Sequence, residues 1–332
     1  MVKKEQRDKR IENLRALAIV LVVFGHSIIL YQKGWGLYET ERSSELLNLI
    51  KSWINMIQMP LFFSLSGYLF YFSIKKANLL NMIQKKIRRI LIPFFIIAVG
   101  WLIPIRKLVG WSNYKGKNLP DILLYDIIGG RDCGHLWFLP CLFLIFIISY
   151  LIISVLKKVI KNENIVNVLF GAVSYMAAYF FYLIPEFYGS DVIRSVAINL
   201  IWFCAGYLLC AYAKVYKNMK KWQLILLLIA SVLVSIGVLT GNFIYSKIPG
   251  LVLLITLYAW IPQTTNGFVE FLSKNSLGIY LFHSPLVYLT YSHIPNANPA
   301  LVIGINFIIF GALAAGITVL IRKLNLKVVI GE

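Results

Sequence analysis

Two ionisable side chains share one face of the first apolar segment. Arg15 and His26 lie eleven residues apart in a run that is otherwise apolar. At about 100° and 1.5 Å per residue, an α-helix places them within about 20° of one face and about 16 Å apart along its axis. Because a neutral imidazole can accept a proton from an attacking hydroxyl, the pair predicts a helix stripe that borders a reaction site. A snorkelling Arg15 and an interhelical hydrogen bond from His26 are the open alternatives.

Two later segments contribute further histidines. The stretch GHLWFLPCLF (134–143) opens the fourth apolar segment, and we expect its His135 at the outer face together with Trp137. We expect His283, in the stretch SLGIYLFHSPLVY (276–288), near the membrane centre and one turn from Tyr280. Ionisable side chains in a bilayer are costly, so by default they face a cavity or a partner. Core hydrogen bonding explains His283 equally well.

A dense basic cluster precedes the third apolar segment. It consists of Lys85, Lys86, Arg88 and Arg89, in the stretch KKIRRILIPFF (85–95). We call these four residues the basic cluster. Such a cluster can bind anionic lipid headgroups or the phosphates of a ligand.

The second apolar segment contains the stretch MPLFFSLSGYLF (59–70). Pro60 removes a backbone hydrogen bond, so we expect a kinked helix with a carbonyl freed for a cavity. Ser64, Ser66 and Gly67 are small enough to let another helix approach closely.

The composition is that of an integral membrane protein. Of 332 residues, 59% are hydrophobic and 14% are charged, and the mean hydropathy is +0.74. No soluble domain buries that much apolar surface, and a bilayer core requires about 20 apolar residues per helical span. We therefore predict one all-α domain over 1–332, a polytopic membrane helical bundle. Its ten predicted transmembrane helices are 12–31, 52–73, 90–108, 137–156, 165–184, 193–213, 222–240, 247–261, 276–292 and 299–321.

The net charge of +19 reflects how basic residues are distributed among the loops of a membrane protein. If the N-terminus is cytoplasmic, 22 of the 33 Lys and Arg residues lie in cytoplasmic segments and ten in outer loops, with Arg15 inside the first helix. This positive-inside asymmetry places both termini, including the basic segment 1–11, in the cytoplasm, and makes 109–136 the longest outer loop. Because the basic residues are dispersed among membrane turns, we exclude nucleic acid as a partner. The four cysteines form no C-x-x-C pair, so we expect no metal site.

Five stretches, in this order, together resemble the acyltransferase-3 family of integral membrane acyltransferases. They are RIENLRALAIVLVVFGH (10–26), MPLFFSLSGYLF (59–70), RILIP (89–93), HLWFLP (135–140) and IYLFHSP (279–285). The resemblance covers nearly the whole chain. It is greatest to the compact, fucose O-acetylase-like subgroup, which lacks an extracytoplasmic esterase-like domain.

This resemblance implies a multi-pass protein of the cytoplasmic membrane. It also implies transfer of an acyl group, commonly acetyl, from cytoplasmic acyl-CoA to a hydroxyl of an envelope glycan or its lipid-linked precursor. The family's activity residues map onto Arg15 and His26, and its donor-binding pattern maps onto the basic cluster. Here Lys85 and Arg89 stand where the family has a pair of arginines. Acetyl-CoA is then a co-substrate, no bound cofactor is expected, and the oligomeric state stays open.

The mechanism that we expect places the CoA phosphates on the basic cluster, with Arg15 guiding the pantetheine toward His26. His26 then acts as general base in a direct transfer or as nucleophile in a stepwise one. The secondary or acceptor-binding residues are His135, Trp137, Tyr280 and His283. No carboxylate that orients His26 is evident, although Asp126 and Asp132 in the outer loop can fold back. A transporter or flippase for an envelope polysaccharide or lipid precursor is the alternative function.

Overall fold

Regular structure is entirely helical in the residues that the structure describes. The structure, a computed structural model, describes residues 8–32, 44–76, 78–183, 191–239 and 247–332. Helices satisfy their own backbone groups, which apolar segments require in a bilayer. The α-helices are α1 (Lys9–Ser27), α2 (Glu45–Asn55), α3 (Gln58–Ser73), α4 (Leu79–Lys86), α5 (Ile92–Ile97), α6 (Ile103–Leu108), α7 (Leu119–Asp121), α8 (Phe138–Val159), α9 (Glu163–Leu183), α10 (Asp191–Ala211), α11 (Ala213–Lys217), α12 (Lys221–Leu239), α13 (Ile248–Trp260), α14 (Gly267–His293), α15 (Pro299–Gly304) and α16 (Phe310–Lys323).

The ten predicted stretches are helical over most of their described lengths. Among the described residues, five helical runs are long and apolar enough to cross a membrane, which confirms the membrane class. The five are Leu79–Leu108, Gly134–Val159, Glu163–Phe181, Val192–Ala211 and Pro299–Lys323. The count of ten spans and the cytoplasmic position of both termini stay predictions. Residues 1–7 of the basic N-terminal segment lie outside the described part of the chain.

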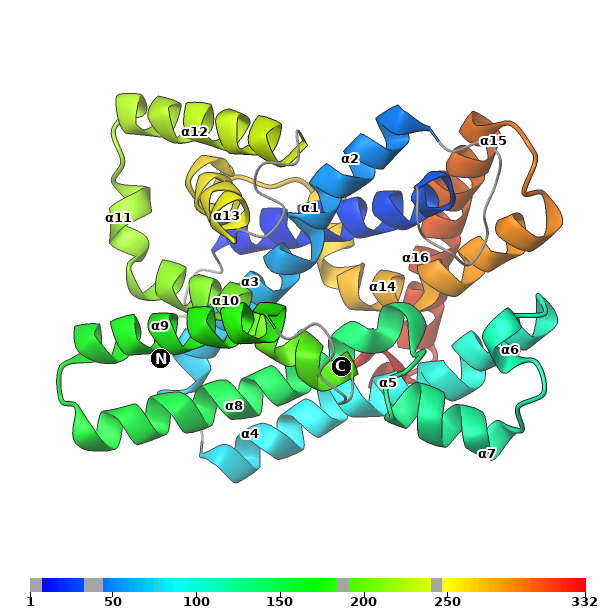
Figure 1. Cartoon of the computed structure of the whole chain (residues 1–332), viewed down its shortest axis with the longest axis horizontal. Coiled ribbons are helices and arrows are strands. Elements are labelled where there is room, and N and C mark those ends of the chain that lie inside the picture. The colour runs from blue at the N-terminus through cyan, green and yellow to red at the C-terminus, as the bar shows by residue number, and fades with distance from the viewer. Residues whose placement is uncertain (1–7, 33–43, 77, 184–190, 240–246) are drawn as a thin grey trace.

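α1 runs through the middle of the bundle and packs along α14 and α3 (Figure 1). Lys9, at the start of α1, forms a 2.8 Å ion pair with Glu270 at the start of α14. Near the other end, the Tyr291 hydroxyl donates a 2.7 Å hydrogen bond to the backbone carbonyl of His26. The two helices therefore run parallel, and their register places His26 beside the second half of α14.

α3 packs closely against α10 through two glycines. A Cβ atom at Gly67 would collide with the backbone carbonyl of Phe203, and one at Gly206 would collide with that of Ser64. The predicted close approach at Gly67 is therefore confirmed, and α10 is the approaching helix.

The distortion expected at Pro60 is a break between two helices and not a kink within one. α2 ends at Asn55 and α3 begins at Gln58, so Pro60 lies in the first turn of α3. The first N–H groups of a helix have no intrahelical acceptor, so a proline there costs no hydrogen bond. The break between α2 and α3, which the apolar run 52–73 hides, is the feature that shapes the site below.

Two prolines in the long helical run Leu79–Leu108 are each preceded by a wider, π-helical turn. π-helical turns at Ile87–Leu91 and Ala98–Leu102 directly precede the turns that hold Pro93 and Pro104. Proline has no N–H and its ring clashes with the carbonyl four residues earlier, which a wider turn accommodates. Pro93 thus deprives the Arg89 carbonyl of its helical donor. The C-terminal turn packs against this carbonyl at Gly331.

Candidate active site

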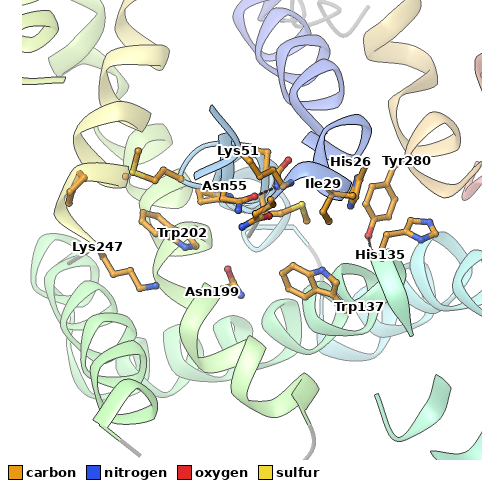
Figure 2. A pocket seen from close by; sticks show the side chains of 17 residues that line it. His26, Ile29, Lys51, Asn55, His135, Trp137, Asn199, Trp202, Lys247 and Tyr280 are labelled. Carbon is orange, nitrogen blue, oxygen red and sulfur yellow. Dashed lines mark hydrogen bonds between the residues drawn. The ribbon is translucent and has the colours of Figure 1, made fainter. Parts of the chain in front are cut away.

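A cavity of about 530 Å³, which we call the outer cavity, opens beside the end of α1. Its walls come from α1, the α2–α3 junction, the 3-10 turn Gly134–Trp137, α10, the start of α13, and α14. Figure 2 shows His26, His135 and Tyr280 at one end and Trp202 and Lys247 at the other. Residues that are far apart in the sequence therefore line one space.

His283 is held by the backbone of its own helix. Its Nδ1 lies 2.9 Å from the carbonyl oxygen of Ile279 and 3.0 Å from that of Tyr280. Carbonyl oxygens only accept hydrogen bonds, so Nδ1 carries the proton and, in the neutral ring, Nε2 carries the lone pair. The tautomer of His283 follows from these two contacts.

This tautomer determines that of His26. The Nδ1 atom of His26 lies 2.9 Å from Nε2 of His283. Because Nε2 of His283 is the acceptor, Nδ1 of His26 is the donor, which leaves the lone pair of His26 on Nε2. His26 lines the outer cavity. An imidazole whose Nδ1–H is fixed and whose Nε2 is basic has the arrangement of a general base or nucleophile.

His135 is positioned by the segment that it faces on α14. Its Nε2 donates a 3.1 Å hydrogen bond to the Leu281 carbonyl, which lacks its helical donor because residue 285 is a proline. The Tyr280 hydroxyl donates to the backbone carbonyl of His135. Nδ1 of His135 is buried and has no hydrogen-bond partner among the described residues. It therefore retains a lone pair that no described residue satisfies.

Arg106 holds the loop that leads into His135. It is buried, lies 3.0 Å from a carboxylate oxygen of Asp132, and donates a 3.2 Å hydrogen bond to the hydroxyl of Tyr288 on α14. Gly134 has a φ of +55°, and a Cβ there would lie 2.7 Å from Nη2 of Arg106. Asp132 therefore stabilises the loop and does not reach His26, whose orienting partner is a histidine.

A second cavity of about 170 Å³, the inner cavity, is lined by Arg15 and Arg89. The structure thus brings together the first-helix arginine and one member of the basic cluster. Tyr280 lines both cavities. A single side chain on α14 therefore borders both the arginine-lined space and the histidine-lined space.

The other members of the basic cluster lie away from the inner cavity. Lys85 and Arg88 are exposed. The ammonium of Lys86 lies 3.3 Å from the ring centroid of Phe146, a cation–π contact. Trp137, one of the predicted secondary or acceptor-binding residues, lines the outer cavity. Within the described residues, no group of three His, Cys, Asp or Glu side chains can hold a metal ion.

A comparison with known protein families gives a match. The family model described as an acyltransferase domain, acyltransferase-3, matches residues 8–322. The chain belongs to the acyltransferase-3 family. Comparison with curated proteins and with solved structures gives no significant match. Family membership and the apolar helices together indicate that this acyltransferase-3 protein is a membrane acyltransferase.

Sequence reasoning missed two lysines of this acyltransferase-3 protein. Lys51 on α2 and Lys247 before α13 both line the outer cavity. Lys51 is 3% exposed, and burial lowers the pKa of its ammonium to about 8. The available signal is that Lys51 is the only charged residue among residues 46–74. Arg106 was also missed, because its role depends on a loop folding back onto α14.

Proposed function

We propose that the protein is a membrane O-acyltransferase. It moves an acyl group, in the simplest case acetyl, from cytoplasmic acyl-CoA to a hydroxyl of an envelope glycan or lipid-linked saccharide. The observation that carries this proposal is the His283–His26 hydrogen bond, because it leaves a basic nitrogen on a residue that lines a large cavity. Family membership supports the reaction class.

The donor belongs to the inner cavity in this proposal. Acyl-CoA carries a pyrophosphate and a further phosphate, and guanidinium groups bind phosphates through paired, charge-assisted hydrogen bonds. Arg15 and Arg89 supply two such groups from different helices. With the N-terminus cytoplasmic, this cavity lies on the side from which the donor arrives. Tyr280 then lies where the thioester passes toward the outer cavity.

The acceptor belongs to the outer cavity. Nε2 of His26 removes the hydroxyl proton as the oxygen attacks the thioester carbonyl, and CoA leaves as the thiol after proton transfer. His135 lines the same cavity as His26, which favours a positioning role on the acceptor. In the stepwise variant, the same Nε2 attacks the thioester first and holds the acyl group.

The test is acyl transfer by purified protein. Wild-type protein in nanodiscs, given radiolabelled acetyl-CoA and envelope glycan, should yield labelled glycan, whereas a transporter or flippase would yield none. His26→Ala should lower the rate about 10²–10⁴-fold, the usual contribution of a positioned general base. His293→Ala is the matched control, because His293 is exposed and bonds locally to Ser292 and Leu289. A folded His26→Ala protein with the wild-type rate would contradict the proposal.

A further inference from the structure

The outer cavity is positively charged. Lys51 and Lys247 line it, and no aspartate or glutamate does so among the residues that the structure describes. In Figure 2, Lys51 lies above the middle of the cavity and Lys247 lies at the end away from His26. Two cations therefore face a space in which no carboxylate from a described residue balances them.

Lys51 is buried, and no described residue of opposite charge pairs with it. It is 3% exposed, and its ammonium makes no hydrogen bond or ion pair within the described residues. A Cβ at Gly25 would lie 3.0 Å from Nζ of Lys51 and 2.7 Å from Oε1 of Gln58, so Gly25 lets both side chains reach the turn that carries His26. A buried charge is expensive unless it is paired. A negatively charged ligand beside His26 would provide the missing partner.

The far end of the cavity suits a sugar. The ammonium of Lys247 lies 5.6 Å from the centroid of the Trp202 ring, and Gly250 leaves room for that indole against α13. Asn199 donates its amide hydrogen to the carbonyl of Ser195, 2.8 Å away, which leaves its side-chain oxygen as an acceptor. An indole face, an amide acceptor and a cation recognise the apolar face, the hydroxyls and the negative group of a saccharide.

We propose that the outer cavity is a subsite for an anionic saccharide, with Lys51 and Lys247 binding its carboxylate or phosphate groups. This inference rests on the proposed function and specifies the chemical class of the acceptor. The donor phosphates do not account for the two lysines, because Arg15 and Arg89 line a different cavity. An anionic group held by Lys51 would keep a neighbouring hydroxyl of the same saccharide near His26.

The experiment compares matched saccharides with full-length protein in nanodiscs. The probes are a uronic-acid disaccharide, its carboxyl-reduced neutral counterpart, and the neutral disaccharide linked to a short polyprenyl diphosphate. Calorimetric binding without acyl-CoA measures the subsite, and acetyl transfer with acetyl-CoA measures the reaction. Tighter binding of the uronic acid identifies a carboxylate ligand, and tighter binding of the diphosphate identifies a lipid-linked one. Equal affinity for all three, or binding of none, would overturn the proposal.

Variants connect the preference to the lysines. Lys51→Met and Lys247→Met should each lower the ratio of anionic to neutral affinity about tenfold to a hundredfold, the range for charge-assisted hydrogen bonds. Lys51→Arg should retain part of the ratio. Lys115→Met is the control, since Lys115 is exposed and lines neither cavity. An unchanged ratio in both Met variants would contradict the assignment. Selective binding of the anionic saccharide without any acetyl transfer would instead contradict the proposed function but support the subsite.

Discussion

The outer and inner cavities border the same tyrosine but differ in chemistry. Histidines, amides, tryptophans and two lysines line the outer cavity, whereas the polar lining of the inner cavity includes two arginines and two serines among apolar side chains. The outer cavity is also about three times larger, at about 530 Å³ against about 170 Å³. Arginine is a strong phosphate ligand but a poor proton carrier, while histidine exchanges protons near neutral pH. The difference supports the proposal that the two cavities bind different substrates and that proton transfer takes place in the outer one.

The largest effects should come from the histidine pair of the outer cavity. We expect His283→Gln to lower kcat about tenfold to a hundredfold, as loss of a group that orients a reactive side chain does. Because His283 acts through His26, the double variant His26→Ala/His283→Gln should be no slower than His26→Ala alone. Steady-state kinetics of the three variants gives the coupling. If the rate loss of the double variant were the product of the two single losses, the two histidines would act independently.

Next in size are the arginines of the inner cavity. Arg15→Met and Arg89→Met should each raise KM for acetyl-CoA about tenfold, because each removes a charge-assisted hydrogen bond. The corresponding lysine variants should lose less, since they keep the charge but not the planar fork. Lys158→Met is the comparison, because Lys158 is exposed, lies outside the basic cluster and lines neither cavity. A rise in KM for the acceptor instead of acetyl-CoA would contradict the assignment of the donor to the inner cavity and the acceptor to the outer cavity.

A smaller effect is expected at the wall of the outer cavity. Gly134→Ala combines a φ of +55° with a collision at Arg106, so it should shift His135, destabilise the fold by about 1–3 kcal/mol, and raise KM for the acceptor only. Gly110→Ala is the matched control. Gly110 has a φ of +67°, but a Cβ there would meet nothing within 4 Å. Thermal unfolding measures the loss of stability in each variant, and acceptor titrations measure the change in KM. Equal effects of the two substitutions would mean that the contact with Arg106 is irrelevant to the site.

The sequence predicts helices well, because long apolar runs and their flanking charges are local features. It also pairs Arg15 with His26 on one stripe, since helical periodicity relates residues within one segment. It does not predict the break at 56–57, because the run 52–73 is apolar on both sides of it. The distortion expected at Pro60 therefore takes the form of a break between α2 and α3 and not of a bend within one helix.

Contacts between distant segments were beyond the sequence. The partner of His26 lies 257 residues away, and finding it requires the register between α1 and α14. The same holds for Lys51, whose nearness to His26 depends on the α2–α3 junction and on Gly25. The basic cluster depends on the fold in another way. Of its four cations only Arg89 lines the inner cavity, and phosphate binding by the other three stays a prediction.

The central claim is that His283 keeps His26 protonated on Nδ1 and basic on Nε2. The most direct measurement is ¹⁵N NMR of the protein in nanodiscs with labelled histidine, assigned with His26→Gln and His283→Gln variants. The account predicts that His26 is protonated at Nδ1, with its Nε2 signal in the range of an unprotonated nitrogen, and that His283→Gln alters this tautomer. A His26 ring that carries its proton on Nε2, or that does not respond to the loss of His283, would contradict it.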